Sequence, residues 1–383
     1  MKYYKKIHSF FRKKYMQICY LTRPKNIKTC FFSSFRGQYS DNPRAVSEYL
    51  HVIAPNLQQV WLLSRKNEMF APDYVKVVYP GTLLAWKMQA QADVWILNCA
   101  YSRKSGVYKG KKTYYIQTWH GDRGLKKIGH LAAEEMGSLY RGFDGLPYLD
   151  DCNLFVVASE YGRRKAIEGL KFQGEFLMTG MPRNDKLVKP EQYEDEKLKI
   201  RKSLSLSEEK ILLYAPTFRD GQSVQNVAIN ISQTLNSLEK DGSKWKCLIR
   251  SHSKSHEIKS TEDNSKFTNV SSYPDMADLL LIADFLITDY SSCAGDFALT
   301  NRPVVLALFD VDEYQEHYRT LKVNPEEAGF LVARNQAELN NICSNLYSYN
   351  HDEIAKKINS YYGTAETGSA SKALADKIVS LMS

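Results

Sequence analysis

The sequence predicts an α/β protein with parallel sheets, divided into two units of domain size. Short apolar runs of strand length alternate with helical segments, which is the order of βαβ units. Polar residues follow several of these runs directly, as they do where strands end at a binding site. A segment at 186–210, rich in Lys and Glu and containing Pro190, separates the two halves. With 383 residues, 43% of them hydrophobic, the chain can bury two cores.

The first half reads as strands and helices in alternation. The predicted strands are Asn26–Phe35, Val60–Ser64, Tyr74–Tyr79, Val94–Asn98, Tyr114–Gln117 and Leu154–Ala158. The predicted helices are Pro43–Ile53, Thr82–Ala92 and Glu160–Gly169, with a further loop and helix before Asp151. A parallel sheet follows from this spacing.

The second half begins with a new apolar strand at Ile211. It continues through Leu248-Ile249, a helix at Met276–Ala283, then Phe285–Thr288, Asp296–Leu299 and Val304–Leu308. Helices are expected from about Glu353 onward, and the sequence does not show whether they return to the first half.

Residues 1–28 carry nine Lys and Arg residues and no acid, whereas the remaining chain is balanced at 43 basic and 43 acidic residues. On a helical wheel, one side holds Tyr3, Tyr4, Ile7, Phe10, Phe11, Tyr15, Ile18 and Leu21, and the other holds Lys2, Lys5, Lys6, Arg12 and Lys13. This pattern predicts a basic amphipathic helix on an anionic membrane surface. The expected membrane contacts are Lys5, Lys6, Phe10, Phe11, Arg12, Lys13 and Lys14. The alternative is a helix packed on its own domain with a solvated basic face.

The same segment cannot span a bilayer or act as an ordinary signal peptide, because Arg12-Lys13-Lys14 interrupts any apolar run. The seven cysteines are scattered without a Cys-x-x-Cys pair, which predicts a reducing compartment, no disulfide and no structural zinc. A nucleic-acid partner is not expected, since the basic charge is concentrated at one terminus rather than spread over a folded surface. The predicted location is the cytoplasmic face of a cell membrane, as a peripheral protein.

The most informative stretch is 282–299, where an apolar strand ends in Thr288-Asp289-Tyr290-Ser291-Ser292 and a helix follows. The N–H groups and the positive dipole end of a helix bind anions, and hydroxyl groups there can hold a phosphate. Ser and Asp are also ordinary helix caps, so this turn alone does not establish a phosphate site.

Three further strand ends carry polar residues of the same kind. They are Thr118-Trp119-His120-Gly121, Ala215-Pro216-Thr217-Phe218-Arg219-Asp220 and Arg250-Ser251-His252-Ser253. The four ends together supply hydroxyl, guanidinium and imidazole groups, which suit phosphate electrostatics and proton transfer. They contain no dense cluster of carboxylates or thiols for a metal.

These segments, in this order, resemble the CDP-glycerol glycerophosphotransferase family of bacterial teichoic acid and capsule synthesis. The resemblance covers roughly residues 29–320. It rests on Phe31–Pro43, Gln117–Gly121, Ala215–Arg219, Arg250–His252, Thr288–Ser292 and Asp296–Leu299. It implies a GT-B fold, in which two Rossmann-like domains face each other across a cleft. The predicted domains are then an N-terminal acceptor-side domain at 29–190 and a C-terminal CDP-donor domain at 191–383, after the membrane segment at 1–28.

The resemblance also implies the reaction. A hydroxyl of a lipid-linked or polymeric glycan attacks the polyol-bearing phosphorus of CDP-glycerol or CDP-ribitol, and CMP leaves. No metal and no other cofactor is implied. The sequence does not identify the polyol, or say whether the enzyme primes, elongates or joins capsule repeats.

Residue roles follow from the resemblance at matching positions. His120 is expected to be the base, with Trp119 limiting water access, and His252 is expected to offset charge on departing CMP. The expected donor contacts are Thr217, Arg219, Arg250, Asp289, Tyr290, Ser291, Ser292 and Asp296. A packed or capping role for His120, a solvated loop position for His252 and a salt bridge for Asp296 are the alternatives.

One segment departs from the family pattern. After Trp119-His120-Gly121 the family commonly continues Thr-Pro-Leu-Lys, whereas this chain has Asp122-Arg123-Gly124-Leu125-Lys126. Trp119, Gly121, Asp122 and Arg123 are therefore the expected acceptor-side residues, and the acceptor itself stays open. Two other function classes remain: a GT-B glycosyltransferase that uses a nucleotide sugar, and a non-catalytic membrane-associated glycan-binding protein.

Overall fold

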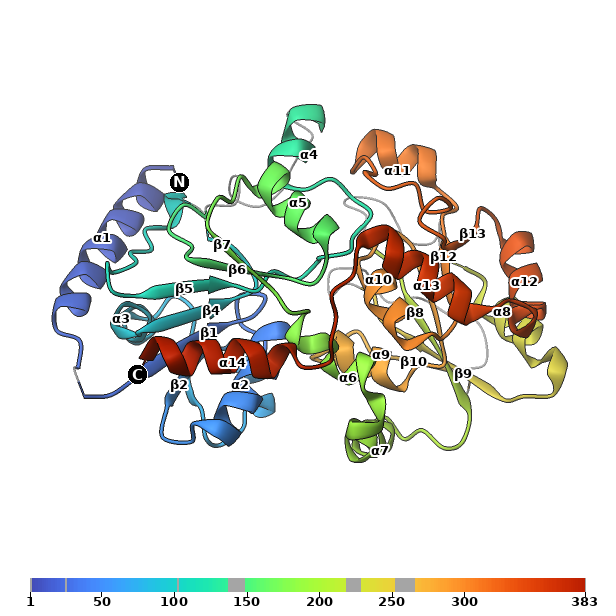
Figure 1. Cartoon of the computed structure of the whole chain (residues 1–383), viewed down its shortest axis with the longest axis horizontal. Helices are drawn as coiled ribbons and strands as arrows, with labels where there is room; N and C mark the ends of the chain where they lie inside the picture. Colours follow the sequence, from blue (N-terminus) through green and yellow to red (C-terminus); the bar gives the residue numbers. More distant parts are fainter. Residues whose placement is uncertain are drawn as a thin grey trace. The chain divides into compact units, whose positions relative to one another are not determined.

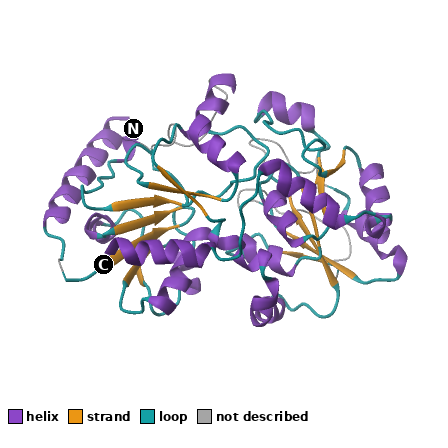
Figure 2. Cartoon of the chain, in the orientation of Figure 1, coloured by secondary structure: helices purple, strands orange, loops and turns teal. Residues whose placement is uncertain are grey.

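The computed structural model describes residues 2–24, 26–101, 103–136, 149–217, 229–251 and 266–382. The chain forms two compact units, each with its own parallel sheet and covering helices (Figures 1 and 2). Unit 1 consists of Met1–Asp122, Arg141–Asp185 and Ala365–Ser383, and unit 2 of Arg123–Tyr140 and Lys186–Thr364. The prediction of an α/β fold with parallel sheets is confirmed.

The sheet of unit 1 has seven strands in the order β3-β2-β1-β4-β5-β6-β7, all parallel. Their bounds are β1 Thr29–Ser33, β2 Gln58–Leu62, β3 Lys76–Val78, β4 Val94–Leu97, β5 Tyr114–Gln117, β6 Leu154–Val157 and β7 Glu175–Met178. Strands β4 and β6 are buried along their whole length. Helices cover both faces of such a sheet, so its central strands read as continuous apolar runs.

The longer helices of unit 1 pack on this sheet or on one another. The α-helices are α1 Lys2–Leu21, α2 Asp41–Ile53, α3 Leu83–Gln91, α5 Glu160–Leu170 and α14 Ala370–Met382. Short 3₁₀ helices lie at Arg65–Phe70, Arg103–Ser105 and Pro182–Asn184, and α6 Asp185–Val188 crosses the boundary to unit 2.

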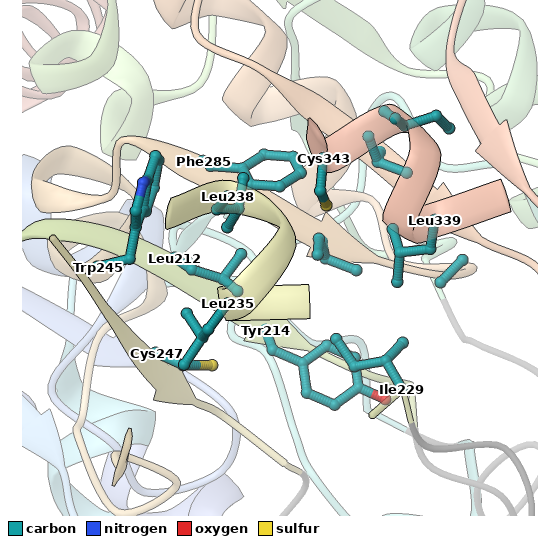
Figure 3. Packing of buried hydrophobic residues seen from close by; sticks show 14 of the residues in the cluster. Leu212, Tyr214, Ile229, Leu235, Leu238, Trp245, Cys247, Phe285, Leu339 and Cys343 are labelled. Carbon is teal, nitrogen blue, oxygen red and sulfur yellow. The ribbon is translucent and has the colours of Figure 1, made fainter. Parts of the chain in front are cut away.

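The sheet of unit 2 has six parallel strands in the order β10-β9-β8-β11-β12-β13. They are β8 Lys210–Ala215, β9 Trp245–Ile249, β10 Phe267–Asn269, β11 Phe285–Thr288, β12 Val304–Ala307 and β13 Leu331–Ala333. The helices are α4 Gly129–Met136, α7 Glu194–Ser203, α8 Ile231–Leu238, α9 Met276–Ile282, α10 Cys293–Phe297, α11 Val311–His317, α12 Gln336–Ser344 and α13 His351–Tyr362. Single 3₁₀ turns occur at Pro190–Tyr193, Glu239–Asp241, Ala298–Thr300 and Leu346–Ser348. One core cluster packs α8 and α12 onto the sheet through buried residues that include Leu235, Phe285 and Leu339 (Figure 3).

The compact units are not the continuous ranges 29–190 and 191–383 expected from the sequence. The last helix, α14, belongs to unit 1 because Leu374 and Ile378 are fully buried in the same core cluster as Val46 and Leu50 of α2. Conversely, Arg123–Tyr140 belongs to unit 2, where the backbone of Leu125 accepts hydrogen bonds from Lys322 and Val323. Residues 1–28 lie within unit 1 rather than standing apart.

Helix α1 packs along α3 through one narrow face. Met16 and Cys19 are buried there, and the Arg12 guanidinium lies 5.5 Å from the centre of the Trp86 ring and donates to Gln89 at 3.3 Å. Arg12 therefore packs on its own domain, which is the alternative to a membrane contact, and its flat cation stacks on the Trp86 ring. Burial lowers the pKa of Arg12 to about 10.

Candidate active site

Both sheets have a topological switch point, where ligands of open α/β folds bind. In unit 1, β1 and β4 are neighbours, and the chain runs outward from them in opposite directions. In unit 2, β8 and β11 are the corresponding pair. The predicted motifs follow these strands or their immediate neighbours, so each unit gathers its polar residues at one sheet edge.

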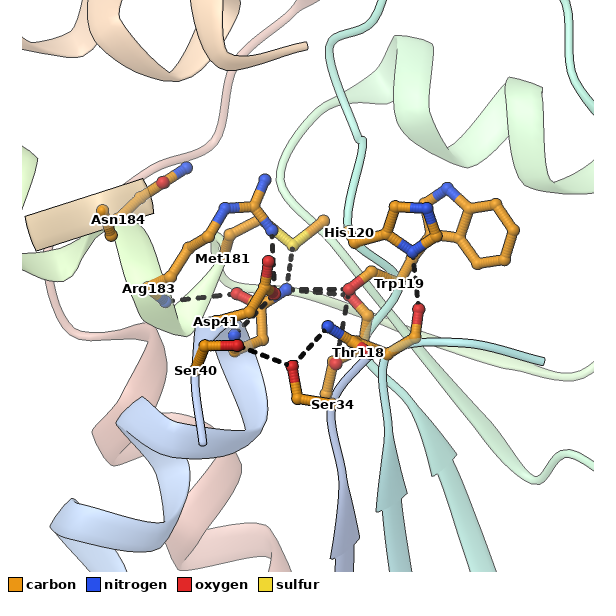
Figure 4. Close-up of polar contacts among 12 residues, drawn as sticks. Ser34, Ser40, Asp41, Thr118, Trp119, His120, Met181, Arg183 and Asn184 are labelled. Carbon is orange, nitrogen blue, oxygen red and sulfur yellow. Dashed lines mark hydrogen bonds and ion pairs between the residues drawn. The ribbon is translucent and has the colours of Figure 1, made fainter. Parts of the chain in front are cut away.

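His120 follows β5, next to the switch point of unit 1. The preceding residue, Trp119, has a left-handed backbone with φ 52°, and its N–H donates to Gln117 Oε1 at 2.8 Å. The side-chain amide of Asn42 donates to the carbonyl oxygens of Thr118 and Trp119 at 3.1 and 3.0 Å (Figure 4). The turn that carries the imidazole is thus fixed from both sides, although a left-handed tryptophan is conformationally unfavourable.

The imidazole of His120 has a defined protonation pattern. Its Nδ1 lies 2.7 Å from the carbonyl oxygen of Asn98, the residue that follows β4. Because a carbonyl oxygen only accepts, Nδ1 carries the proton and Nε2 of the neutral ring carries the lone pair. Burial lowers the pKa of His120 below its ordinary value, while the Asn98 hydrogen bond and the charge of Asp41 act in the opposite direction. A neutral imidazole with a free basic nitrogen is what a general base requires.

Asp41 and Arg183 complete the polar environment of His120, and sequence reasoning did not single them out. Asp41 begins α2 with a left-handed φ of 63°, and its carboxylate pairs with Arg183 Nη1 at 3.3 Å (Figure 4). Asn42 Oδ1 accepts from the backbone N–H of Arg183 at 3.1 Å. The polar run Ser40-Asp41-Asn42 before Pro43 and the Arg-Asn pair after β7 were the available signals.

Lys165 of α5 supports the loop that follows His120. Its ammonium is buried and donates to the carbonyl oxygens of Gly121 at 2.6 Å and Asp122 at 2.8 Å. The Asp122 carboxylate in turn accepts from Ala158 N at 3.0 Å and from the hydroxyl of Ser159. Asp122, expected on the acceptor side, is therefore a buried residue that anchors the start of α5.

Trp119, another expected acceptor-side residue with a large side chain, lies beside His120, with ring centres 4.7 Å apart.

In unit 2, Asp289 joins the two strand ends at the switch point. The N–H of Thr217, which follows β8, donates to both carboxylate oxygens at 2.9 and 3.0 Å. The N–H of Tyr290 donates to the same carboxylate at 2.6 Å. Asp289 and Thr217 thus shape the edge of the sheet, and a carboxylate with these partners is poorly suited to approach a phosphate.

Tyr290 and the two serines after it play different parts. The Tyr290 ring is fully buried, stacks on Tyr314 at 3.7 Å between centres and donates its hydroxyl to Asp310 at 2.8 Å. Its side chain is a packing element, so the expected donor contact is wrong for the ring. Ser291 and Ser292 are partly exposed at the start of α10 and remain available to a ligand.

Arg250 follows β9, the neighbour of β8. Its Nη1 atom is buried and has no hydrogen-bond partner within the part of the chain that the structure describes. Burial lowers the pKa of Arg250, and the charge of Asp275 opposes that effect. A buried guanidinium N–H without an acceptor is uncommon in folded proteins, and an anionic ligand would satisfy it.

Asp296 and Arg123 form a buried ion pair in unit 2. Arg123 Nη2 lies 3.0 Å from Asp296 Oδ1, and Arg123 Nη1 donates to Asn359 at 3.4 Å. A Cβ atom on Gly295 would lie 2.7 Å from Arg123 Cβ, so glycine permits this close approach. For Asp296 the structure shows the alternative role, a salt bridge, and its partner is Arg123, which was expected on the acceptor side; both side chains are buried against each other.

Two expected site residues, Arg219 and His252, lie outside the described residues. The described ranges contain no group of three or more His, Cys, Asp or Glu residues that could hold a metal ion. The prediction that no metal takes part stays a prediction.

Comparison with known proteins identifies the family. The profile of CDP-glycerol:poly(glycerophosphate) glycerophosphotransferases matches residues 15–380. The chain belongs to this family. Its members are phosphotransferases, so the enzyme class expected from the sequence is confirmed at the level of the family.

Several curated relatives are teichoic acid enzymes. The chain is 28% identical over 376 residues to the teichoic acid poly(glycerol phosphate) polymerase of Bacillus spizizenii, covering 93% of each protein. It is 31% identical over 325 residues to the teichoic acid glycerol-phosphate transferase of Staphylococcus aureus, covering 78% of each. A poly(ribitol-phosphate) polymerase of Bacillus spizizenii is 27% identical over 218 residues.

Among solved structures, the wall teichoic acid polymerase TagF aligns with a TM-score of 0.80 and 25% identity, covering 96% of this chain and 93% of that one. Two parallel α/β sheets together with this neighbour make the fold GT-B-like. A UDP-GlcNAc 2-epimerase from Neisseria meningitidis, at 12% identity and a TM-score of 0.54, shares the fold alone.

Proposed function

We propose that this protein transfers a polyol phosphate, in the first instance glycerol phosphate, from a CDP-polyol to a hydroxyl of a lipid-linked or polymeric cell-wall or capsule glycan and releases CMP. Membership of the glycerophosphotransferase family supports the donor and the reaction type. The observation that carries the mechanism is the His120 imidazole, whose Nδ1 is occupied by Asn98 and whose Nε2 is left to accept a proton.

In the proposed reaction, His120 Nε2 takes the proton of the acceptor hydroxyl as its oxygen forms a bond to the polyol-bearing phosphorus. The bond from that phosphorus to the bridging oxygen breaks, and CMP leaves with the bond's electron pair. Arg250 stabilises negative charge on the donor pyrophosphate, and Ser291 and Ser292 donate hydrogen bonds to it. His252 and Arg219 are proposed to act on the same pyrophosphate, and the protein's own cations take the place of a metal ion.

We also propose that α1 attaches the enzyme to the cytoplasmic face of a bacterial membrane. Five apolar side chains of the helix are between 52% and 82% exposed: Ile7, Phe10, Phe11, Ile18 and Leu21. Ile7, Phe10, Ile18 and Leu21 lie on the side of the helix away from α3, and Phe11, at the margin of that side, meets the Trp86 ring edge-on with centres 6.3 Å apart. The basic residues Lys6, Lys13 and Lys14 are exposed on the same helix. Apolar and basic groups arranged in this way favour an anionic lipid surface. The described helices include none with both the length and the apolar character that a membrane crossing needs.

The deciding experiment measures CMP release from CDP-glycerol and from CDP-ribitol, with a glycan acceptor present or absent. Acceptor-dependent release that falls by about 10²–10⁴-fold in His120→Gln is expected, the range typical for loss of a general base. His51→Gln, which changes a histidine of the same unit at the end of α2, should leave the rate unchanged.

Each other outcome points to a different function. Consumption of a nucleotide sugar in place of either CDP-polyol would favour a GT-B glycosyltransferase. Glycan binding without turnover of any donor, unaffected by His120→Gln, would favour a non-catalytic binding protein.

A further inference from the structure

The turn between β1 and α2 holds three consecutive residues with positive φ. Phe35, Arg36 and Gly37 have φ values of 42°, 60° and 142°. Glycine adopts such angles without penalty, but an aromatic residue and an arginine do not. Strain of this kind persists where the surrounding structure enforces it, and it is concentrated at functional sites.

Contacts from three directions enforce the turn. The N–H of Phe35 donates to Asn98 Oδ1 at 2.9 Å, and the N–H of Gly37 donates to the carbonyl of Ser34 at 2.9 Å. The carbonyl of Gly37 accepts from Ser64 N at 2.9 Å and from Asn67 Nδ2 at 2.7 Å. A side chain at Gly37 would bring its Cβ within 2.9 Å of Ser64 N, so the backbone approaches too closely for any residue but glycine.

The strained turn exposes both of its large side chains, and the first of them lies beside the base. Phe35 is 40% exposed and Arg36 is exposed, whereas Ser34 and Gly37 on either side are buried. The Phe35 ring meets the His120 ring edge-on, with centres 5.4 Å apart. Asn98 binds both the turn and the base, since its side-chain oxygen accepts from the N–H of Phe35 and its backbone carbonyl accepts from the His120 ring. The backbone of the turn and the imidazole of His120 are therefore held by the same residue, at the β1/β4 switch point where a substrate is expected.

We infer that Phe35 and Arg36 form an acceptor subsite that recognises a phosphate group next to the attacking hydroxyl. The inference rests on the proposed function and names the substrate class of the same site. A guanidinium presents a fixed, planar set of donors that matches phosphate oxygens, and the phenyl ring offers an apolar surface to the carbons of a polyol or sugar. In a chain that ends in glycerol phosphate, three carbons at most separate the terminal hydroxyls from the preceding phosphate. The subsite thus selects acceptors that already carry a polyol phosphate over neutral saccharides.

The test compares two soluble acceptors that differ by a single group: a neutral alkyl disaccharide, and the same glycoside carrying one glycerol phosphate unit. CMP release from CDP-glycerol gives KM and kcat for each, and calorimetry without donor gives each acceptor's Kd. The variants are Arg36→Gln, which removes the charge, and Arg36→Gly, which also suits the left-handed backbone. Arg164→Gln, at an exposed arginine of α5 in the same unit, is the matched control.

Both Arg36 variants should raise KM and Kd for the phosphorylated acceptor about tenfold or more, the range for losing a hydrogen bond to a charged group. They should leave the values for the neutral acceptor and for CDP-glycerol within about twofold. Arg36→Gly should unfold at the same or a higher denaturant concentration than the wild type, since glycine relieves the strain at φ 60°.

Equal losses for both acceptors, or no loss for either, would overturn the inference. No CMP release by the wild type, with selective binding of the phosphorylated glycoside retained and lost in both Arg36 variants, would instead overturn the proposed function and leave the phosphate subsite standing.

Discussion

The imidazole Nδ1 of His120 donates a hydrogen bond to the carbonyl oxygen of Asn98 at a distance of 2.7 Å. This contact joins the ends of β5 and β4 and leaves Nε2 as the basic atom of the ring. It also gives the acid-base behaviour of the enzyme a defined origin, because the ring must lose its charge before it can accept a proton.

The acidic limb of the rate profile should lie below pH 6.5. Burial lowers the pKa of His120 from its ordinary value of 6.5, so the neutral form of the base predominates at that pH. A plot of kcat/KM for the acceptor against pH should therefore have the midpoint of its acidic limb below pH 6.5. A midpoint at or above pH 6.5 would contradict this assignment.

The lowered pKa of His120 also makes the free energy of unfolding decrease as pH falls through 6.5, since the unfolded chain gains the proton first.

Two charges around His120 should move that limb in opposite directions. Lys165 lowers the pKa of His120 and Asp41 raises it. Lys165→Met should shift the acidic limb to higher pH, and Asp41→Asn should shift it to lower pH, each by about 0.5–1 unit. Two further neighbours are Arg183, which lowers the pKa of His120, and Cys99, whose own pKa burial raises to about 12, so that its thiol stays neutral.

Lys165→Arg is the control for this pair, because it keeps the charge while changing the shape of the donor to Gly121 and Asp122. It should preserve the pH midpoint even if kcat decreases. Loss of activity without any movement of the midpoint in Lys165→Met would mean that the lysine only holds the loop.

The Arg123–Asp296 pair should be important for the stability of unit 2. Its side chains are 0% and 5% exposed, so removal of one partner leaves a buried charge. Asp296→Asn or Arg123→Met should each lower the free energy of unfolding by about 3–5 kcal/mol, whereas replacing both with apolar residues should cost less than the two single changes together. Urea unfolding followed by fluorescence measures this. The exposed pair Lys372–Asp376, at 59% and 52%, is the comparison, and Asp376→Asn should cost less than about 1 kcal/mol.

The parallel sheets could be predicted from the sequence because strands buried on both faces, such as Val94–Leu97 and Leu154–Val157, stand out as short apolar runs. Weaker strands were missed. Glu175–Met178 at one sheet edge is partly exposed along its whole length, and its apolar run, Phe176–Met178, is only three residues long.

The position of His120 was predictable, but its surroundings were not. Asp41, Asn42, Lys165 and Arg183 come from α2, α5 and the turn after β7, and nothing local in their sequence marks them as neighbours of His120. Pairing of Arg123 with Asp296, 173 residues apart, is likewise a product of the tertiary fold. Residue type indicates which side chains suit phosphate chemistry. Only the packing shows which of these side chains are buried in the fold instead, as Tyr290 is.

Helix α1 allows a test in which adjacent basic residues behave differently. Arg12 stacks on Trp86, whereas Lys13 and Lys14 are exposed beside Phe10 and Phe11. Lys13→Gln with Lys14→Gln should weaken binding to vesicles that contain anionic lipid by about tenfold or more, at about 1 kcal/mol for each charge. Phe10→Ser with Phe11→Ser should weaken binding further and also on neutral vesicles, because it removes the inserted apolar surface.

Arg12→Gln should leave vesicle binding within about twofold. It should instead loosen the packing of α1 on α3, and faster proteolytic cleavage within α1 would show this. Equal loss of vesicle binding in Arg12→Gln and the lysine variant would show that α1 leaves α3 when it meets the lipid, so that its buried face takes part as well.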